Sequence, residues 1–521
     1  MTVALKSLRP RAVEAISLPS PAICYVAASG ALFAAWVGFY LFDPFGYDRP
    51  LRDTWHHVAV LRELMAHPFA PSNPHIPTAE ASRYFTPISL LAALVGRALA
   101  LSPYALLGYL GAVSLIGLAA GCWSFGRRYF GSPWAPLALL LSLMFAWGDP
   151  SSHAGFHNYG TWISSAAYPS SLAFVFGLFF WTSSLKAAER RSLLRLLGLA
   201  IFAAVVLLTH QLSGAIAVAG AGSFILFHPR ASAHNKAACL TAIGLGCLAT
   251  LAWPYFSIVD VLASTPDDRW QSAFPEMSWV STAMVSALIP LAGIIGFRKP
   301  SGALRLELVV PTATFIIAYV VFQAQGSAIA HRLPPAFMLF GQLGIVWMLL
   351  DHSEKLRAPS YVRMGVVATL SLILLGAFAS INPRLKDLEF RATNGHTLET
   401  AQQIAAFLPA GSVSYATESI VFPLQSTGRR VVSIPRPEPV APSLPARQEA
   451  TDRFFDAHTD QAERLRLIER WGATHAVFRP LEMDPDLVKE LRALGPSRRF
   501  QPDIEVVKLD RPVSHTEGRG R

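Results

Sequence analysis

Asp53, His56 and His57 have the residue types and the spacing of a reactive site. If the segment 51–66 is helical, positions i, i+3 and i+4 place all three side chains on one face. A carboxylate in that place can take a proton from a hydroxyl group as a general base. With imidazoles it can also hold a divalent cation such as magnesium or manganese. Two structural interpretations stay open: Asp53 caps the helix, and the histidines pack and form hydrogen bonds at an interface.

Further candidates lie in polar stretches that separate apolar runs. The stretch 148–167 has no Lys or Arg, yet it is rich in His and Gly, and Arg332 is the single basic residue of 324–332. A guanidinium can bind a phosphate through two parallel hydrogen bonds. His210 could instead turn the chain, and Arg332 could anchor lipid headgroups. We expect substrate-binding roles for His56, Arg83, Tyr84, His153, His157, His210 and Arg332.

The elements that must position these residues are apolar helices. Of the 521 residues, 52% are hydrophobic and only 15% are charged, and long continuous apolar runs recur from Ile23 to Phe378. A soluble domain carries about 25% charged residues, so a soluble enzyme, a disordered chain and a fibrous repeat are excluded. Continuous runs also argue against a β-barrel. The four cysteines lie in these runs and show neither a disulfide framework nor metal-ligand spacing.

The net charge of +10 reflects topology and not nucleic-acid binding. Lys and Arg gather in short loops between apolar runs, as the positive-inside pattern requires. This pattern predicts about 11 transmembrane helices, a cytoplasmic N-terminus and an extracytoplasmic tail after Ile381. It holds only if the short segment 87–101 lies in the membrane interface and does not span. The predicted basic loops contain Arg127 and Arg128; Lys186 to Arg195; Arg230 and Lys236; Arg298 to Arg305; and Lys355 to Arg363.

We therefore predict a polytopic α-helical membrane protein in two domains. Residues 1–382 form the transmembrane domain, with a large first outer loop at 43–103. Residues 383–521 form a small α/β domain, because this part is charged and has no run long enough to span. Its pattern predicts helices at 397–407, 446–455 and 461–471, strands at 412–415, 431–434, 474–478 and 504–509, and a proline-rich loop at 435–445.

Several motifs together resemble the GT-C superfamily, which comprises polytopic glycosyltransferases that use sugars linked to polyprenyl phosphate. The motifs of the membrane part are an acidic first outer loop, the segment SRYFTPISLLAALVGRALALSP that follows it, the basic turn GRRYFG, the histidine of LLTHQLSG and the arginine of HRLPPAFMLF. In the tail, FLPAGSVSYA, GRRVVSIP and LIERWGATHAVFRP are similar to the outer α/β domain of uncharacterised bacterial members. Many relatives have paired Asp and Glu in the first loop, whereas Thr54 follows Asp53 here.

The resemblance implies an inverting sugar transfer at the periplasmic face of the bacterial inner membrane, in cell-envelope polysaccharide biosynthesis. Asp53 is the implied base, with His57 as a second catalytic residue and with Asp43 and Asp48 as rivals of Asp53. Arg332 and Arg83 would balance the charge of the leaving phosphate. The implied partners are a polyprenyl-phosphate-linked donor, a glycan, lipid or protein acceptor, and the bilayer. A non-catalytic protein that binds lipid-linked glycan is one alternative, and a polymerase or ligase that depends on His331 and Arg332 is another.

Overall fold

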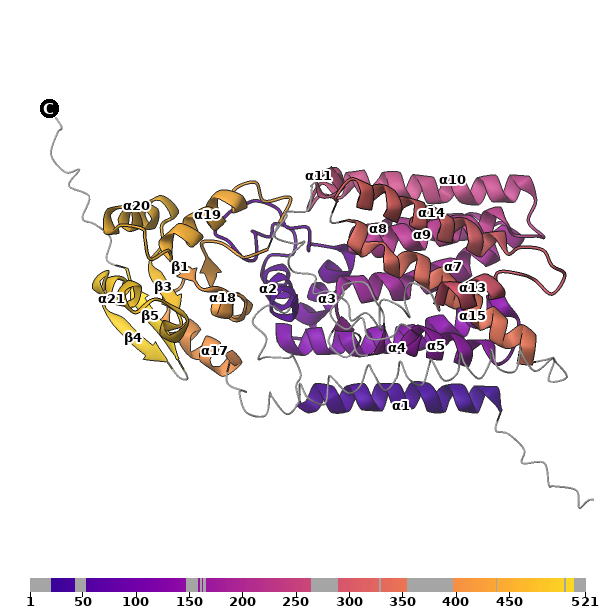
Figure 1. The fold of residues 1–521 in the computed structure, drawn as a ribbon, viewed down its shortest axis with the longest axis horizontal. Coiled ribbons are helices and arrows are strands. Elements are labelled where there is room, and N and C mark those ends of the chain that lie inside the picture. Colours follow the sequence, from indigo (N-terminus) through magenta and orange to yellow (C-terminus); the bar gives the residue numbers. More distant parts are fainter. Residues whose placement is uncertain are drawn as a thin grey trace, which may run out of the picture.

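The protein, described here by a computed structural model, consists of a long helical bundle and a small α/β region that lies beyond one end of it (Figure 1). We call the end of the bundle next to the α/β region the junction end. The structure describes residues 20–42, 53–146, 158–159, 162, 165–263, 289–327, 329–353, 397–436, 438–500 and 503–509. The predicted boundary between the two domains, at 382–383, lies outside these residues.

Six helices of the described residues are long and apolar enough to cross a membrane. They are α1 (Pro21–Phe42), α4 (Pro103–Phe130), α7 (Pro169–Glu189), α10 (Ala233–Ala249) with the short helix η1 (Thr250–Ala252), α14 (Leu306–Ala324) and α15 (Pro334–Ser353). Shorter apolar helices run beside them: α5 (Ala135–Phe145), α8 (Leu193–Thr209), α9 (Gln211–Leu226) and α13 (Ile289–Gly296). A polytopic helical architecture is thus confirmed, while the count of 11 spans stays a prediction.

The helices begin and end where the sequence supplies caps. Ser102 accepts a hydrogen bond from the backbone N–H of Ala105 at the start of α4, and Pro103 follows it at the first helical position. Gly131 ends the same helix in the left-handed conformation, with φ of 75°. Ser192 and Ser232 cap α8 and α10 in the same way. These caps therefore divide the apolar sequence into separate helices.

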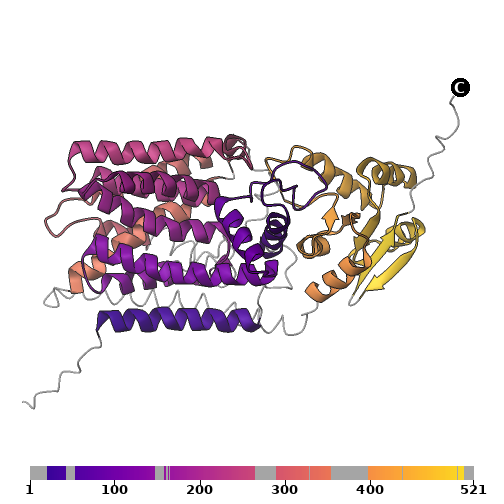
Figure 2. The same ribbon diagram turned by 180° about the vertical axis from the view of Figure 1, so that it is seen from behind.

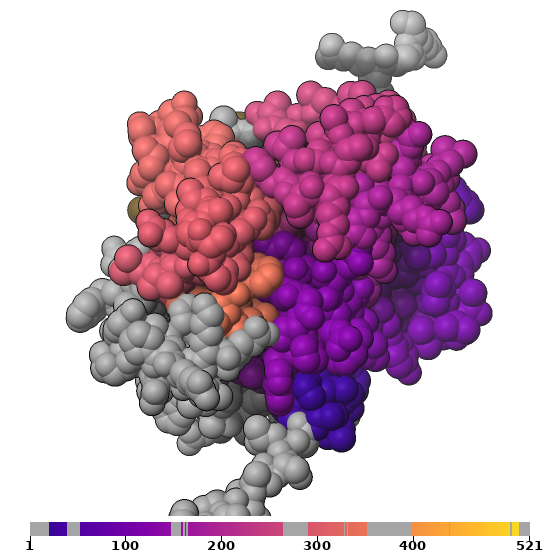
Figure 3. Space-filling view, turned by 90° about the vertical axis from the view of Figure 1, so that its right-hand side faces the viewer, coloured from indigo at the N-terminus to yellow at the C-terminus, as the bar shows by residue number. Residues whose placement is uncertain are grey.

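The basic loops gather at the end of the bundle opposite the junction. Arg128 forms an ion pair with Glu189, and Arg305 pairs with Asp351 at 2.9 Å. Seen from this end, the segments from α4 to α10 pack beside α13 to α15 (Figure 3). Basic loops that are far apart in sequence therefore share one end, as the positive-inside pattern requires. From behind, α1 lies along one edge of the bundle (Figure 2).

Two short helices occupy the junction end. These are α2 (Asp53–Ala66) and α3 (Pro87–Ala98), and they pack against each other. With 12 residues, α3 is about 18 Å long, well short of the ~30 Å apolar core of a bilayer. The prediction that this segment does not span is therefore consistent with its length. The helix α11 (Ile258–Ala263) lies at the same end (Figure 1).

The α/β region is built on a five-stranded mixed sheet in the order β2-β1-β3-β5-β4. β1 pairs in parallel with β2 and β3, whereas β5 is antiparallel to β3 and β4. The strands are β1 (Val413–Ala416), β2 (Arg430–Val431), β3 (His475–Phe478), β4 (Ser497–Phe500) and β5 (Ile504–Lys508). The helices are α17 (Thr397–Phe407), α18 (Glu418–Ser426), α19 (Leu444–Phe454), α20 (Gln461–Trp471) and α21 (Pro485–Ala493).

Successive residues of the sheet face two different cores. Tyr415 packs with Phe454 and Ile468, whereas its neighbour Ala416 packs with Ile420 and Ile404. All four predicted strands and all three predicted helices are present, although β2 is only two residues long. The prediction missed α18, whose pattern is interrupted by Pro423, as well as α21 and β4.

We expect helix α10 to tolerate an added methyl group at Gly244 but not at Gly246. A Cβ at Gly244 meets open space, whereas at Gly246 it would collide with the backbone carbonyl of Ala200 on α8. Gly246→Ala should lower stability by about 1–3 kcal/mol, the usual cost of overpacking. Gly244→Ala should be neutral or slightly stabilising, because alanine favours helix more than glycine does. Thermal unfolding of the two purified variants checks this; equal midpoints would contradict the close helix contact.

Candidate functional site

Helix α2 carries the candidate site and is buried on nearly all sides. Val58 and Leu61 pack against apolar residues of α3 and α4, including Ala92 and Leu107. Trp55 packs instead into a core of the α/β region. The helix therefore lies between the bundle and the α/β region, and its polar side chains face the junction between them.

A chain of buried polar groups crosses this junction. His56 Nε2 lies 3.1 Å from His75 Nε2, and His75 Nδ1 lies 3.1 Å from Oε1 of Gln425 on α18. The amide oxygen only accepts, so His75 donates from Nδ1 and its Nε2 accepts from His56. Burial lowers the pKa of His75 to about 3, helped by the nearby charge of Arg430 and opposed by the bond to Gln425. Burial, with smaller contributions from neighbouring charges, also lowers the pKa of His56, so both rings are neutral.

Other side chains add to this connection. Arg430, the first residue of strand β2, donates to the carboxylate of Glu63 at 2.8 Å. Arg62 donates to the backbone oxygen of Ser426 at 3.0 Å, and the hydroxyl of Tyr104 lies 2.8 Å from that of Ser426. Removing one partner of such a buried contact leaves the other unsatisfied, at a cost of about 1–3 kcal/mol. The α/β region is thereby fixed to the first loop.

Asp53 begins α2 and forms an ion pair with Arg436 of the α/β region. The guanidinium of Arg436 also lies over the ring of Phe422, 5.4 Å from its centre. Burial lowers the pKa of Arg436 to about 10. The carboxylate keeps about 38% of its surface exposed, so a ligand can still reach it.

Arg83 and Tyr84 lie next to each other at the same junction. Arg83 donates from its guanidinium to the hydroxyl of Tyr84 at 3.1 Å. Its backbone N–H donates to the buried carboxylate of Glu438 at 3.0 Å. The ring of Tyr84 packs edge-on against His56, with 4.0 Å between ring centres. One more residue of the 435–445 segment thus contacts the first loop.

His57, His210 and Arg332 come together from three separate stretches of sequence. Burial lowers the pKa of His57 to about 3, and the nearby imidazole of His210 makes a smaller contribution. Burial likewise lowers the pKa of His210 to about 3, and the positive charges of Arg332 and Arg83 lower it further. The pKa of Arg332 is itself lowered by burial and by Arg83. Two guanidinium groups and neutral imidazoles therefore share one region of positive potential, which suits an anion.

His210 has a second role in the fold. Its Nδ1 accepts a hydrogen bond from the backbone N–H of Ser213 and so caps helix α9. The structural alternative for this residue, a turn between two apolar runs, is therefore correct. It does not exclude a place in the site, because the charges of Arg332 and Arg83 act on the same ring.

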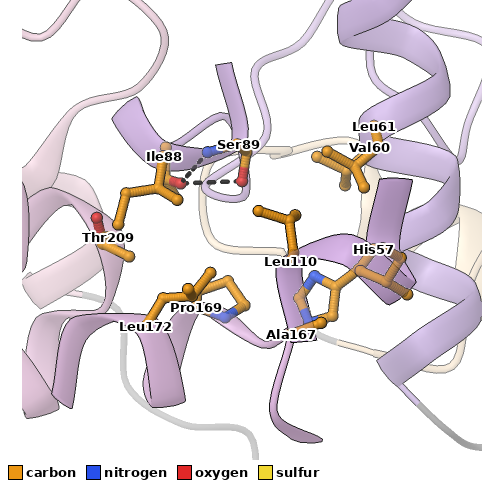
Figure 4. Close-up of a pocket in the computed structure, with 12 residues that line it drawn as sticks. His57, Val60, Leu61, Ile88, Ser89, Leu110, Ala167, Pro169, Leu172 and Thr209 are labelled. Carbon is orange, nitrogen blue, oxygen red and sulfur yellow. Dashed lines mark hydrogen bonds between the residues drawn. The ribbon is translucent and has the colours of Figure 1, made fainter. Parts of the chain in front are cut away.

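A narrow pocket lies beside His57 (Figure 4). His57 lies on one side of it, and Leu172 and Thr209 lie on the other. Thr86 accepts from the backbone N–H of Ser89 at 3.1 Å and thereby caps α3 at its rim. The remaining lining is almost wholly apolar: Val60, Leu61, Ile88, Leu107, Leu110, Ala167 and Pro169.

Seven residues singled out in the sequence lie at this junction: Asp53, His56, His57, Arg83, Tyr84, His210 and Arg332. Arg332 acts electrostatically on residues of the site, and its phosphate role stays a prediction. His153, His157, Asp43 and Asp48 lie outside the described residues. Sequence reasoning missed His75, Arg436 and Glu438 as members of the site. No sequence signal marks these three residues, because charged and polar side chains are ordinary in a polar loop or tail.

A metal site is not seen in the part of the chain that the structure describes. Within it, three or more His, Cys, Asp or Glu side chains nowhere gather in a way that could hold a metal ion. The carboxylate of Asp53 is paired with Arg436, and His56 contacts His75, so neither presents a ready ligand set. The divalent cation stays a prediction, because Asp43, Asp48 and Asp149 lie outside the described residues.

Comparisons with known proteins are informative at the level of the fold. No family model matches the sequence, and neither does any curated protein. Two structures of the arabinofuranosyltransferase AftD from mycobacteria, one of them a mutant, are similar to this chain. Their TM-scores are 0.58 and 0.55, with 15% and 17% sequence identity. Each alignment covers 93% of this chain but only 41% and 40% of AftD.

A structure of the oligosaccharyltransferase from Archaeoglobus fulgidus in complex with Zn and sulfate is also similar, with a TM-score of 0.47 and 10% identity over 92% of this chain and 72% of that one. The chain spans about two fifths of the length of AftD. Its apolar helices and its α/β region together have a fold similar to that of AftD, which agrees with the resemblance noted in the sequence. This chain is a membrane protein.

We expect the free energy of unfolding to fall at acidic pH, because histidines are buried at the junction. An exposed histidine has a pKa of about 6.5, whereas burial holds the pKa of His57 and His75 at about 3. Between pH 7 and pH 5 the unfolded chain therefore takes up protons that the folded chain does not. The free energy of unfolding should fall by about 2 kcal/mol for each buried histidine over this range.

Thermal unfolding at both pH values measures this, with His75→Gln expected to reduce the pH dependence. His458→Gln, which replaces an exposed histidine, is the matched control and should leave the pH dependence unchanged. A His75→Gln variant with the full pH dependence of the wild type would contradict the burial argument.

Proposed function

We propose that the protein transfers a sugar from a polyprenyl-phosphate carrier to an acceptor hydroxyl at the periplasmic face of the bacterial inner membrane. The observation that carries the proposal is the meeting of a carboxylate, neutral imidazoles and two guanidiniums at one end of a GT-C-like bundle. AftD, whose fold is similar, is an arabinofuranosyltransferase, which agrees with this reaction class.

The proposed reaction is a single inverting displacement. The acceptor oxygen bonds to the anomeric carbon while the bond from that carbon to the phosphate oxygen breaks. The acceptor proton passes to Asp53, and the electron pair leaves with the polyprenyl phosphate. His57 lies one helical turn after Asp53 and faces the pocket, where a neutral ring can hold a sugar hydroxyl by a hydrogen bond.

The leaving phosphate needs positive charge close by. Arg83 and Arg332 act electrostatically on each other and on His210, which places both in the same small region. A buried guanidinium is worth far more to a developing phosphate charge than an exposed one. We assign the phosphate to this pair of arginines.

A protein that binds lipid-linked glycan without transferring it is the second candidate. The observation that favours it is the ion pair of Asp53 with Arg436, which engages the proposed base. Turnover separates the two candidates, because both predict binding of the donor.

We expect Asp53→Asn to reduce transfer by about 10²- to 10⁴-fold, because the amide keeps the shape of the side chain but cannot accept the proton. Transfer from a labelled polyprenyl-phosphate sugar in reconstituted membranes measures it. Binding of the donor should remain, since Asp53 does not contact the phosphate. Transfer at the wild-type rate would disprove the assignment; if His331→Ala were then inactive, the polymerase or ligase alternative would be favoured.

We expect Arg332→Gln to weaken donor binding by about 10- to 100-fold, the usual worth of a hydrogen bond to a charged partner. The measurement is the KM for the donor together with direct binding of the polyprenyl phosphate. Arg190→Gln is the control, because Arg190 is exposed at the basic end of the bundle. Equal donor affinity in Arg332→Gln and wild type would remove Arg332 from the phosphate site.

A further inference from the structure

We propose that the α/β region supplies a positioning residue to the active site: Arg436 holds the carboxylate of Asp53 in the orientation in which it accepts the proton of the acceptor hydroxyl. This inference rests on the proposed function, since it concerns the base of that reaction. It goes beyond the proposed function because it makes the α/β region part of the catalytic apparatus and not only a neighbour of it.

The first support is that Arg436 is fixed from several sides. Its guanidinium pairs with Asp53 and lies over the ring of Phe422, which is itself buried to 1% exposure on α18. Just before it in the chain, the backbone oxygen of Ile434 accepts a hydrogen bond of 2.6 Å from Gln448. A guanidinium held in this way loses little further freedom when it orients a carboxylate.

The second support is that the same segment contacts the first loop again two residues later. Glu438 is buried and accepts from the backbone N–H of Arg83 and from the hydroxyl of Ser82. Arg436 therefore pairs with the carboxylate of Asp53, whereas Glu438 binds the backbone of Arg83 and also interacts electrostatically with its guanidinium. This arrangement fixes the register of the segment, because a shift by one residue would break both contacts.

The third support is the exposure of the two partners. The Arg436 side chain is 18% exposed, whereas that of Asp53 is 38% exposed. Arg436 is the more buried of the two partners, and the Asp53 side chain keeps surface open to a ligand. This is the arrangement of an orienting partner, since a cation that blocked the base would cover its reactive side.

The experiment compares kcat and the donor KM in reconstituted membranes for Arg436→Gln, Arg436→Lys and Arg436→Ala. We expect Arg436→Gln to lower kcat by about 100-fold, the scale of a small misplacement of a catalytic group. The donor KM should change less than about threefold, because Arg83 and Arg332 bind the phosphate. Arg436→Lys should recover most of the kcat, and added guanidinium ion should partly restore Arg436→Ala. Arg466→Gln, which breaks an exposed ion pair on α20, should match the wild type.

Each outcome decides the matter. A kcat of Arg436→Gln equal to that of the wild type would overturn the inference. A higher kcat would also overturn it, because it would show that Arg436 restrains the base. Loss that neither lysine nor guanidinium ion reverses would also overturn it, because such loss is merely structural. A further test is that Arg436→Gln should cost nothing more in an Asp53→Asn background. If Asp53→Asn alone kept full activity, the proposed function would fail, and that result is distinct from a failure of Arg436.

Discussion

The organisation of the site depends on the burial of polar side chains between α2 and the α/β region. The contact from His56 through His75 to Gln425 and the ion pair of Glu63 with Arg430 place hydrogen-bonding groups out of reach of water. Each group is tolerable there only because the other side provides its partner. These contacts therefore fix the first loop and the α/β region relative to each other. They also fix the position of Asp53, because it begins α2.

Most of the architecture was accessible from the sequence because it follows from strong local rules. Continuous apolar runs must form helices in a bilayer, and short basic loops must lie on one side. Ser102, Pro103 and Gly131 mark the ends of α4 in the sequence itself. The length of α3 also follows from the sequence, since Pro87 begins it and Ala100, with a positive φ of 51°, follows soon after its end.

The site was accessible only in part, for a physical reason. Side chains such as Asp53, His57 and Arg332 stand out because polar groups next to apolar runs need an explanation. Arg436, Glu438 and His75 have no such mark, since charged residues are ordinary in a polar tail or loop. Their place depends on contacts between distant segments, which helical or strand periodicity does not encode. Strand β4 was missed likewise, because its exposed Arg498 and Arg499 conceal the pairing with β5.

The long-range contacts of α2 have a consequence for how the protein is made. The partners of Arg62 and Glu63 on α18 and β2 lie 364 to 367 residues later in the chain. At a synthesis rate of about 5–20 residues per second, α2 emerges roughly 20 to 70 seconds before they do. During that interval Trp55 and the histidines have no α/β region to cover them. The junction between α2 and the α/β region can therefore assemble only late in synthesis, and a nascent chain that stalls before residue 420 lacks the partners of α2.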